Sequence, residues 1–344
     1  MSAVAITCVV LALATVLLPV VFIIIGAVQK RRATRPVSYY PPRGFSPIDV
    51  MCKYTGKKSA YRNLFSAVTL YWAARGFITI EEDCKRGLKL TKLKPLDSPS
   101  GGAFDPETFR EEVVLFDKIF EKGDEFYTLA ASDEYKKDYD KFESRCSAVA
   151  EDTQSALSKK MSLASLVSSL VMLAAVTVII GVWTRNAVMV ASIFTIVGIL
   201  FMKFARPGYD NDAVRLLMFP FFALWSGMPT AAILVTIPFD CAVAYAVAIV
   251  SCILVSFLLY DKIDVRSAQN IKHYGEIDAF KTFLVQAEKD KLETLVEEDP
   301  EYFYNILPYF YVLDITEKMK VKFDRIVMDG PSWYLGELRD TLMF

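Results

Sequence analysis

The chain contains one histidine, His273, and six cysteines among its 344 residues. A metal centre made of several imidazoles is therefore excluded, and so is a Ser-His-Asp triad elsewhere in the chain. The cysteines form no Cys-X-X-Cys motif and have no metal-ligand spacing, so neither a metal site nor a disulfide framework is expected. We predict that the protein is not an enzyme and has no metal or cofactor site.

The chain also has no excess of positive or negative charge, because it contains 39 Lys and Arg residues and 40 Asp and Glu residues. This balance gives no general reason to expect a nucleic acid or an acidic partner. The charges are nevertheless segregated, since they are nearly missing from five long apolar runs. The runs are Val4–Val28, Leu163–Trp183, Ala187–Phe204, Leu216–Pro238 and Ala242–Tyr260.

Each run is long enough to cross, or nearly cross, a hydrocarbon layer of about 30 Å as a helix. A helix satisfies its own backbone hydrogen bonds in lipid. The sequence therefore predicts an α-helical multi-pass membrane protein with five transmembrane helices. The near absence of ionisable side chains within the runs is not typical of coupled transporters or pumps, which need such groups along their pathway.

The basic residues Lys30, Arg31, Arg32 and Arg35 follow the first run, and no charged residue precedes it. The positive-inside rule then places the N-terminus outside and both large polar segments in the cytoplasm, with the protein in the plasma membrane. A cleaved signal peptide is the alternative for the first run. The run exceeds the usual apolar length and lacks a basic start, so a retained anchor is favoured.

The apolar runs and the linkers between them divide the chain into six parts. These are a transmembrane anchor at 1–29, a linker at 30–45, a winged-helix-like module at 46–97, cytoplasmic helices at 98–160, four transmembrane helices at 161–260 and a cytoplasmic C-terminal helical region at 261–344.

The module at 46–97 has the layout of a winged helix-turn-helix domain, which is an α+β fold. Ser46-Pro47 is typical of a helix start, and Ala60–Arg75 has the spacing of an amphipathic helix. Gly76 follows where a left-handed C-terminal cap is expected. Phe77–Glu81 and Leu88–Leu93 alternate apolar and polar residues, which indicates a hairpin.

Basic residues outnumber acidic ones in this module. One interpretation is DNA binding, in which Arg62 on the second helix and Lys85 and Arg86 on the wing contact phosphates. The other interpretation is that the module binds a protein and that the same side chains meet anionic lipid. We favour the second interpretation.

The C-terminal region is rich in aromatic residues. Glu276–Glu298 is predicted to form one helix, followed by shorter ones that include Thr316–Phe323. The aromatic side chains either form a core, which is favoured, or make a partner surface. The candidate residues for such a surface are Tyr302, Phe303, Tyr309, Trp333 and Tyr334.

Three motifs in this region are distinctive in combination: AEKDKLE at 287–293, ILPY at 306–309 and PSWY at 331–334. With the stretch Pro41–Glu82, they make the chain resemble the bacterial YciQ-like predicted membrane proteins, a family of unknown function. The resemblance implies the same order of spans and no established chemistry. Those relatives usually carry an extracytoplasmic domain before the first span, whereas this sequence begins at that span.

The leading hypothesis is a non-enzymatic scaffold or regulatory platform in the plasma membrane, with a cytoplasmic or membrane protein as partner besides the lipid bilayer. A membrane-tethered winged-helix regulator that binds nucleic acid is the first alternative. The second is a small-solute transporter or channel that uses a broken fourth span, since Pro220, Gly227 and Pro229 lie in that run.

Overall fold

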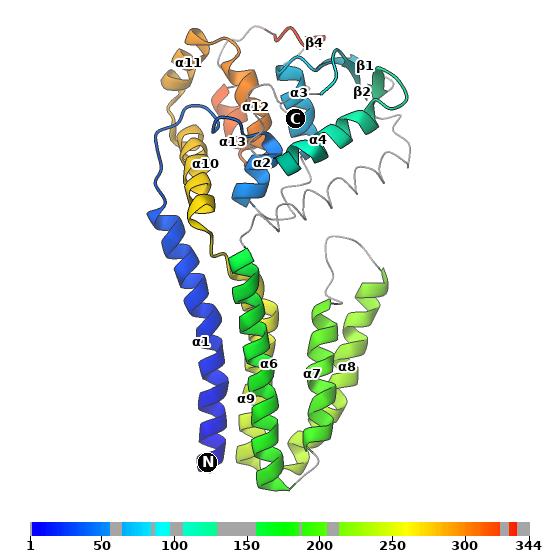
Figure 1. Ribbon diagram of the computed structural model, residues 1–344, viewed down its shortest axis with the longest axis vertical. Coiled ribbons are helices and arrows are strands. Elements are labelled where there is room, and N and C mark those ends of the chain that lie inside the picture. Colours follow the sequence, from blue (N-terminus) through cyan, green and yellow to red (C-terminus); the bar gives the residue numbers. More distant parts are fainter. Residues whose placement is uncertain are drawn as a thin grey trace. The chain divides into compact units, whose positions relative to one another are not determined.

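The computed structural model describes residues 2–55, 64–83, 87–96, 106–128, 156–185, 188–204, 213–323 and 330–335. The chain divides into two compact units, each made from two separate stretches of sequence (Figure 1). The membrane unit comprises Met1–Arg32 and Ser155–Ser267. The globular unit comprises Ala33–Gln154 and Ala268–Phe344.

All five apolar runs are helical in the membrane unit. The helices are α1 (Ala3–Arg32), α6 (Ala156–Thr184), α7 (Val188–Phe204), α8 (Ala213–Thr236) and α9 (Phe239–Ile253), the last continued by η3 (Leu254–Leu259) and η4 (Tyr260–Lys262). Among the described residues, three helical stretches are long and apolar enough to cross a membrane. These candidate spans are Ala3–Arg32, Ser158–Thr184 and Phe239–Lys262.

Small residues let the helices of this unit approach closely. Ala5 and Cys8 of α1 and Ala244 and Ala248 of α9 are fully buried in one cluster, as expected where helix packing in lipid depends on close contact between backbones. A side chain added at Gly198 of α7 would overlap Ser226 of α8. The break in the fourth apolar run that the transporter alternative requires is absent, because α8 continues through both of its prolines as one helix.

The globular unit is mostly helical. Its helices are α2 (Pro47–Val50), η1 (Met51–Thr55), α3 (Leu64–Ala74), α4 (Pro106–Ile119), α10 (Ala268–Gln286), α11 (Lys289–Glu298), α12 (Tyr302–Val312) and α13 (Thr316–Phe323). Ser46 caps α2 in a capping box with Asp49, as Ser46-Pro47 predicted. The single helix predicted at Glu276–Glu298 is wrong, because α10 ends at Gln286 and α11 starts three residues later.

A small mixed sheet completes the globular unit. Its strands are β1 (Ile78–Asp83), β2 (Gly87–Lys92), β3 (Glu125–Tyr127) and β4 (Tyr334–Leu335), in the order β3-β2-β1-β4. The predicted hairpin is confirmed as the antiparallel pair β1 and β2. Gly76 enters β1 with a φ of 70°, a conformation that favours glycine. The strand β4 pairs in parallel with β1 at Ile80 and Tyr334, so both polar segments contribute to one sheet.

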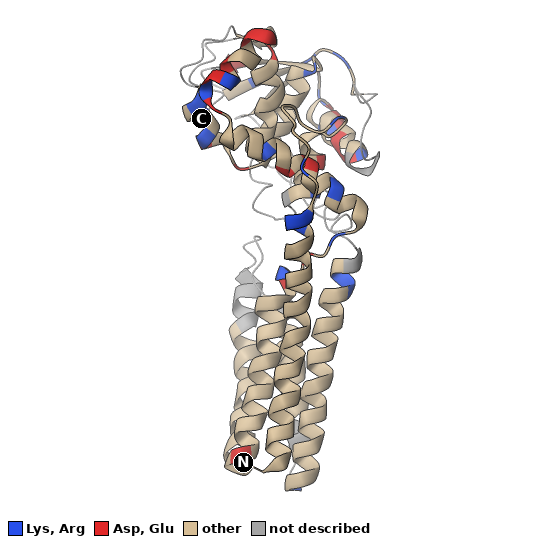
Figure 2. Ribbon diagram, turned by 90° about the vertical axis from the view of Figure 1, so that its left-hand side faces the viewer, with Lys and Arg blue, Asp and Glu red and all other residues tan. Residues whose placement is uncertain are grey.

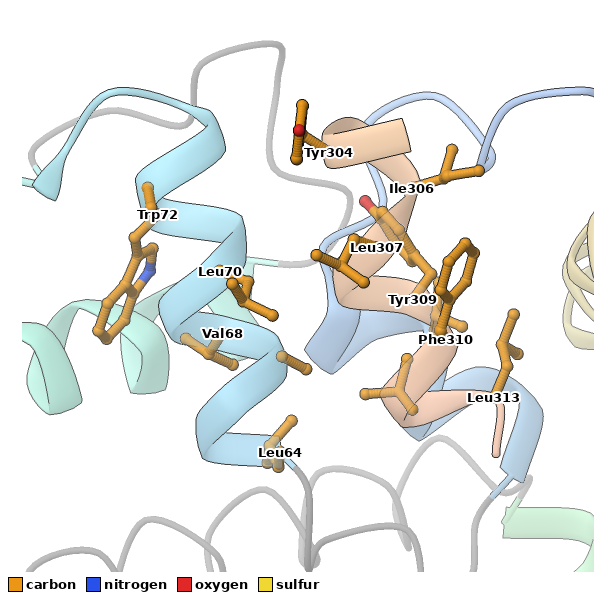
Figure 3. Close-up of a cluster of buried hydrophobic side chains, with 14 of the residues drawn as sticks. Leu64, Val68, Leu70, Trp72, Tyr304, Ile306, Leu307, Tyr309, Phe310 and Leu313 are labelled. Atoms are coloured by element: carbon orange, nitrogen blue, oxygen red, sulfur yellow. The ribbon is translucent and has the colours of Figure 1, made fainter. Parts of the chain in front are cut away.

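The two polar segments also share one hydrophobic core, in which α12 packs against α3 (Figure 3). Leu64 and Val68 of α3 and Leu307 and Tyr309 of α12 are at most 1% exposed. Burying a large apolar side chain of this kind contributes roughly 1.5–3 kcal/mol to folding. Segments that flank the membrane helices in the sequence are thus one folding unit.

The linker was predicted at 30–45, but its first three residues belong to α1. The stretch from Ala33 to Phe45 has no helix or strand and is fastened to the globular unit. The Arg35 Nε donates to the Asp278 carboxylate at 2.6 Å, and the Tyr54 hydroxyl donates to the same group at 2.8 Å. The carbonyl group of Thr34 lies where a side chain at position 275 would be, so the close approach of the stretch to α10 requires glycine there. This stretch is therefore an anchored strap on α10.

Candidate functional site

The most unusual side chain of the globular unit is a carboxyl group inside its core. Glu112 lies on α4, whose apolar residues recur at helical spacing, and it is 3% exposed. The indole Nε1 of Trp72 donates a hydrogen bond to Glu112 Oε1 at 2.7 Å. Trp72 points from α3 toward α4 and packs edge-on against Phe116 (Figure 3). The carboxyl group is thus bonded to an aromatic ring in the core and joins two helices.

Its surroundings make Glu112 a weak acid. Burial raises the pKa of Glu112 to about 8, while the hydrogen bond from Trp72 lowers it by a smaller amount. The nearby Asp49 carboxylate raises the pKa further, and the Arg75 guanidinium opposes this. The loss of hydration of the charged carboxylate in the core therefore has a larger effect on this pKa than the charges of Asp49 and Arg75, which act in opposite directions. At neutral pH the group is largely protonated.

Two tyrosines adjoin this carboxyl group and stay protonated. Burial raises the pKa of Tyr71 to about 12, although the Arg75 guanidinium, 5.0 Å from its ring centroid, lowers it. Burial also raises the pKa of Tyr309, whose hydroxyl donates to the Phe45 carbonyl oxygen at 2.7 Å. Both tyrosines therefore keep their protons at neutral pH, whereas the pKa of Glu112 lies near it.

We call Asp49, Tyr71, Trp72, Glu112 and Tyr309 the buried carboxyl cluster. It draws on α2, α3, α4 and α12, so both polar segments of the sequence contribute to it. The chemistry that Glu112 offers is uptake and release of a proton near neutral pH. In the part of the chain that the structure describes, this cluster included, no three His, Cys, Asp or Glu side chains are grouped to hold a metal ion.

A second polar cluster lies inside the membrane unit. Tyr245 of α9 is fully buried, and its hydroxyl lies near those of Thr177, Ser192 and Thr195. The Thr195 and Thr230 hydroxyl oxygens are 2.7 Å apart and link α7 to α8. Hydrogen bonds between helices in lipid contribute about 0.6–2 kcal/mol each. The bond between Thr195 and Thr230 therefore stabilises the packing of α7 on α8, and Tyr245 brings a polar group of α9 close to it.

The five aromatic residues that the sequence offered as a partner surface are all interior. Tyr302, Phe303, Tyr309, Trp333 and Tyr334 are between 0% and 9% exposed and belong to the core of the globular unit. This is the core arrangement that the sequence favoured.

The predicted phosphate or lipid contacts at Arg62, Lys85 and Arg86 lie outside the described residues. Basic side chains beside them on the hairpin are engaged within the protein. Lys89 contacts the Glu125 carboxylate at 2.9 Å, and the Lys94 ammonium lies 4.4 Å from the centroid of the Phe77 ring.

Sequence reasoning missed Glu112 because an acidic residue on an amphipathic helix is usually solvated. A signal was present: Glu112 follows Phe109 by three residues and precedes Phe116 by four, so it lies on the apolar face. A carboxyl group on the apolar face of a helix needs a hydrogen-bond donor, because burying it without one is costly. The identity of that donor, Trp72, could not be read from spacing.

The fold and its three candidate spans define the class as an α-helical membrane protein with a globular unit. The family described as "Predicted membrane protein (DUF2207) C-terminal domain" matches residues 36–323. The chain belongs to this family, whose function is unknown. The comparison with curated proteins found no match. The comparison with solved structures found none either.

Proposed function

We propose that this membrane protein is a non-enzymatic scaffold or regulatory platform in the plasma membrane. It has five transmembrane helices, an N-terminus outside and both polar segments in the cytoplasm. Its partner is a cytoplasmic or membrane protein. The positive-inside pattern supports the orientation, because Lys30, Arg31 and Arg32 end α1, whereas no charged residue lies at its start.

One observation carries the proposal: the two polar segments make one rigid core instead of two independent tails. Tyr309 of α12 bonds to the Phe45 backbone, and Tyr302 donates to the Tyr39 carbonyl oxygen at 2.8 Å. The hairpin of the first segment is extended by β4 of the second. A globular unit tied in this way can transmit the binding of a partner to both chain segments that enter the membrane helices.

The surface of α11 is a suitable contact for such a partner. From Glu288 to Glu301 the chain has seven carboxylates and two lysines. Figure 2 colours the acidic and basic positions along the ribbon. The side chains of Glu297 and Glu298 are exposed. Leu292 and Leu295 fasten the opposite face of α11 to the core. Charge of one sign on a fixed helix selects partners of opposite charge and accelerates their association. We therefore expect the partner to present a basic surface.

The test is site-specific photo-crosslinking in cells with the full-length protein. A photoreactive residue replaces Thr294, an exposed position on α11. We expect one discrete crosslinked protein, identified by mass spectrometry. Its yield should fall at least tenfold when Glu297→Lys and Glu298→Lys are combined, because about 1.4 kcal/mol of lost attraction corresponds to a factor of ten.

The matched control reverses two exposed carboxylates on another helix, by Asp117→Lys on α4 and Glu121→Lys just after its end. The control should crosslink like the unmodified protein. If the full-length protein yields no discrete product, or if both double variants behave alike, the platform proposal is wrong in this form.

The nucleic-acid alternative rests on the order of α3, β1 and β2. A recognition helix must present one face to the DNA groove. In α3, however, the residues Leu64, Ala67, Val68, Leu70, Trp72 and Ala73 are all buried. This burial weighs against the alternative. Retention of the full-length protein on duplex DNA at low salt, with steep loss as salt rises, would favour it instead.

The transport alternative has the hydroxyl cluster around Tyr245 in its favour and the unbroken α8 against it. It predicts solute flux in proteoliposomes that is sensitive to Tyr245→Phe. Equal flux with empty liposomes for every solute tested would remove this alternative.

A further inference from the structure

Three helices of the membrane unit meet at one end of the bundle. Gln29 near the end of α1 exchanges two hydrogen bonds with the backbone of Arg266, at 3.0 and 3.3 Å. At the start of α6, the Ser158 hydroxyl donates to the Ile263 carbonyl oxygen at 2.6 Å. The end of α1, the start of α6 and the chain that follows α9 therefore lie together, with α1 and α9 parallel and α6 opposed.

Among the described residues, basic side chains outnumber acidic ones at this end. In one group a single carboxylate is shared by two cations: Asp264 contacts the Lys30 ammonium at 2.5 Å and the Arg266 guanidinium at 3.1 Å. Beyond this group, the described residues near this end include five exposed basic residues and one exposed carboxylate, Asp261. We call these five residues the basic end of the membrane unit: Arg31, Arg32, Lys159, Lys160 and Lys262.

The opposite end of the membrane unit has no such group of basic side chains among its described residues. Among the described residues there, the charged side chains are Arg185 and Asp240, and Asp240 accepts a hydrogen bond from the Ser2 backbone at 2.8 Å. The basic charges are thus gathered at one end, from separate helices that the fold brings together.

Exposed apolar side chains lie within one or two turns of the basic residues. Ile24 and Val28 on α1 are 56% and 39% exposed, and Leu163 and Val167 on α6 are 54% and 49% exposed. Such side chains on a candidate span face the acyl chains of lipid. A site that pairs ammonium and guanidinium groups with an adjoining apolar surface fits a molecule with a phosphate group and acyl chains.

We propose that the basic end binds the headgroup of an anionic phospholipid such as phosphatidylglycerol. Arg31 and Arg32 offer guanidinium donors to the phosphate oxygens, and Lys159 and Lys160 add two ammonium groups from α6. The acyl chains lie along the exposed apolar surface of α1 and α6. The protein therefore prefers anionic to zwitterionic lipid.

The experiment is native mass spectrometry of the full-length protein in a neutral detergent. The protein is titrated with phosphatidylglycerol or phosphatidylcholine of identical acyl chains, and bound lipid is counted. We expect a preference for phosphatidylglycerol that falls about fivefold for each basic residue neutralised near the lipid surface. Lys159→Gln combined with Lys160→Gln should therefore reduce it by roughly 25-fold.

The matched control, Arg185→Gln combined with Lys289→Gln, also removes two charges and should retain the preference. A second double variant, Arg31→Gln with Arg32→Gln, tests α1 independently, and thermal unfolding in the same detergent verifies that each variant folds. The proposal fails if the unmodified protein binds both lipids equally, or if neither double variant at the basic end differs from the control. It also fails if excess inorganic phosphate alone displaces the lipid, because the site would then take a free anion.

Discussion

Replacing Glu112 by glutamine tests the role of the buried carboxyl cluster. Glutamine has nearly the same shape and keeps the oxygen that accepts the hydrogen bond from Trp72. It cannot ionise. The substitution therefore separates the proton of Glu112 from its packing.

The expected magnitude follows from the pKa. Burial raises the pKa of Glu112 from an ordinary value of 4.5 to about 8, so the folded state holds this proton more tightly than the unfolded state. Stability is then complete below about pH 4.5 and falls as the pH rises toward 8. At about 1.4 kcal/mol per pH unit, the loss reaches about 5 kcal/mol at pH 8, an order-of-magnitude value. The Glu112→Gln variant should avoid this loss.

Hydrogen–deuterium exchange of the full-length protein in detergent measures the effect. The free energy of opening of the amides in α3 and α4, corrected for the intrinsic exchange rate, is followed from pH 5 to pH 8. We expect it to fall with pH in the unmodified protein and to remain nearly level in Glu112→Gln. Infrared difference spectra should show the C=O stretch of a protonated carboxyl group near neutral pH, and Glu112→Gln should lack it.

Asp117→Asn is the matched control, because Asp117 lies on the same helix and is exposed. It should reproduce the pH dependence of the unmodified protein. The reasoning is refuted if α4 opens with the same free energy at pH 5 and pH 8 in the unmodified protein, or if Glu112→Gln follows it at every pH.

Three further substitutions test the packing. Tyr309→Phe leaves the Phe45 carbonyl oxygen without its buried donor and should lower the free energy of unfolding of the globular unit by about 1–3 kcal/mol, measured by denaturant titration. Gly198→Val should force α7 away from Ser226 of α8 and lower the thermal unfolding temperature in detergent, whereas the same change at Gly227, which has open space, should have little effect. Lys322→Met removes the ammonium that donates to three carbonyl oxygens at and just beyond the end of α10, and faster amide exchange there should result, with Lys318→Met as the exposed comparison.

Local signals in the sequence were sufficient for most elements. Thr316–Phe323 was predicted with the boundaries that α13 has, and Gly76 ends α3 where a left-handed residue was expected. These signals work because hydrophobic spacing, capping and turn chemistry act over a few residues. The same reasoning joined α10 to α11, because Ala287 and Glu288 between them carry no glycine or proline to mark the break.

The sequence by itself determined that this is a helical membrane protein with two polar segments, because long apolar runs can satisfy their backbone only as helices in lipid. Tertiary structure decided that the two segments form one unit. The pairing of β1 with β4 and the packing of α12 on α3 join residues far apart in the chain, and no local pattern encodes such contacts. Tertiary structure also decided that Glu112 is buried beside Trp72, since the pKa of a carboxyl group depends on the solvent and charges around it and not on its neighbours in the sequence.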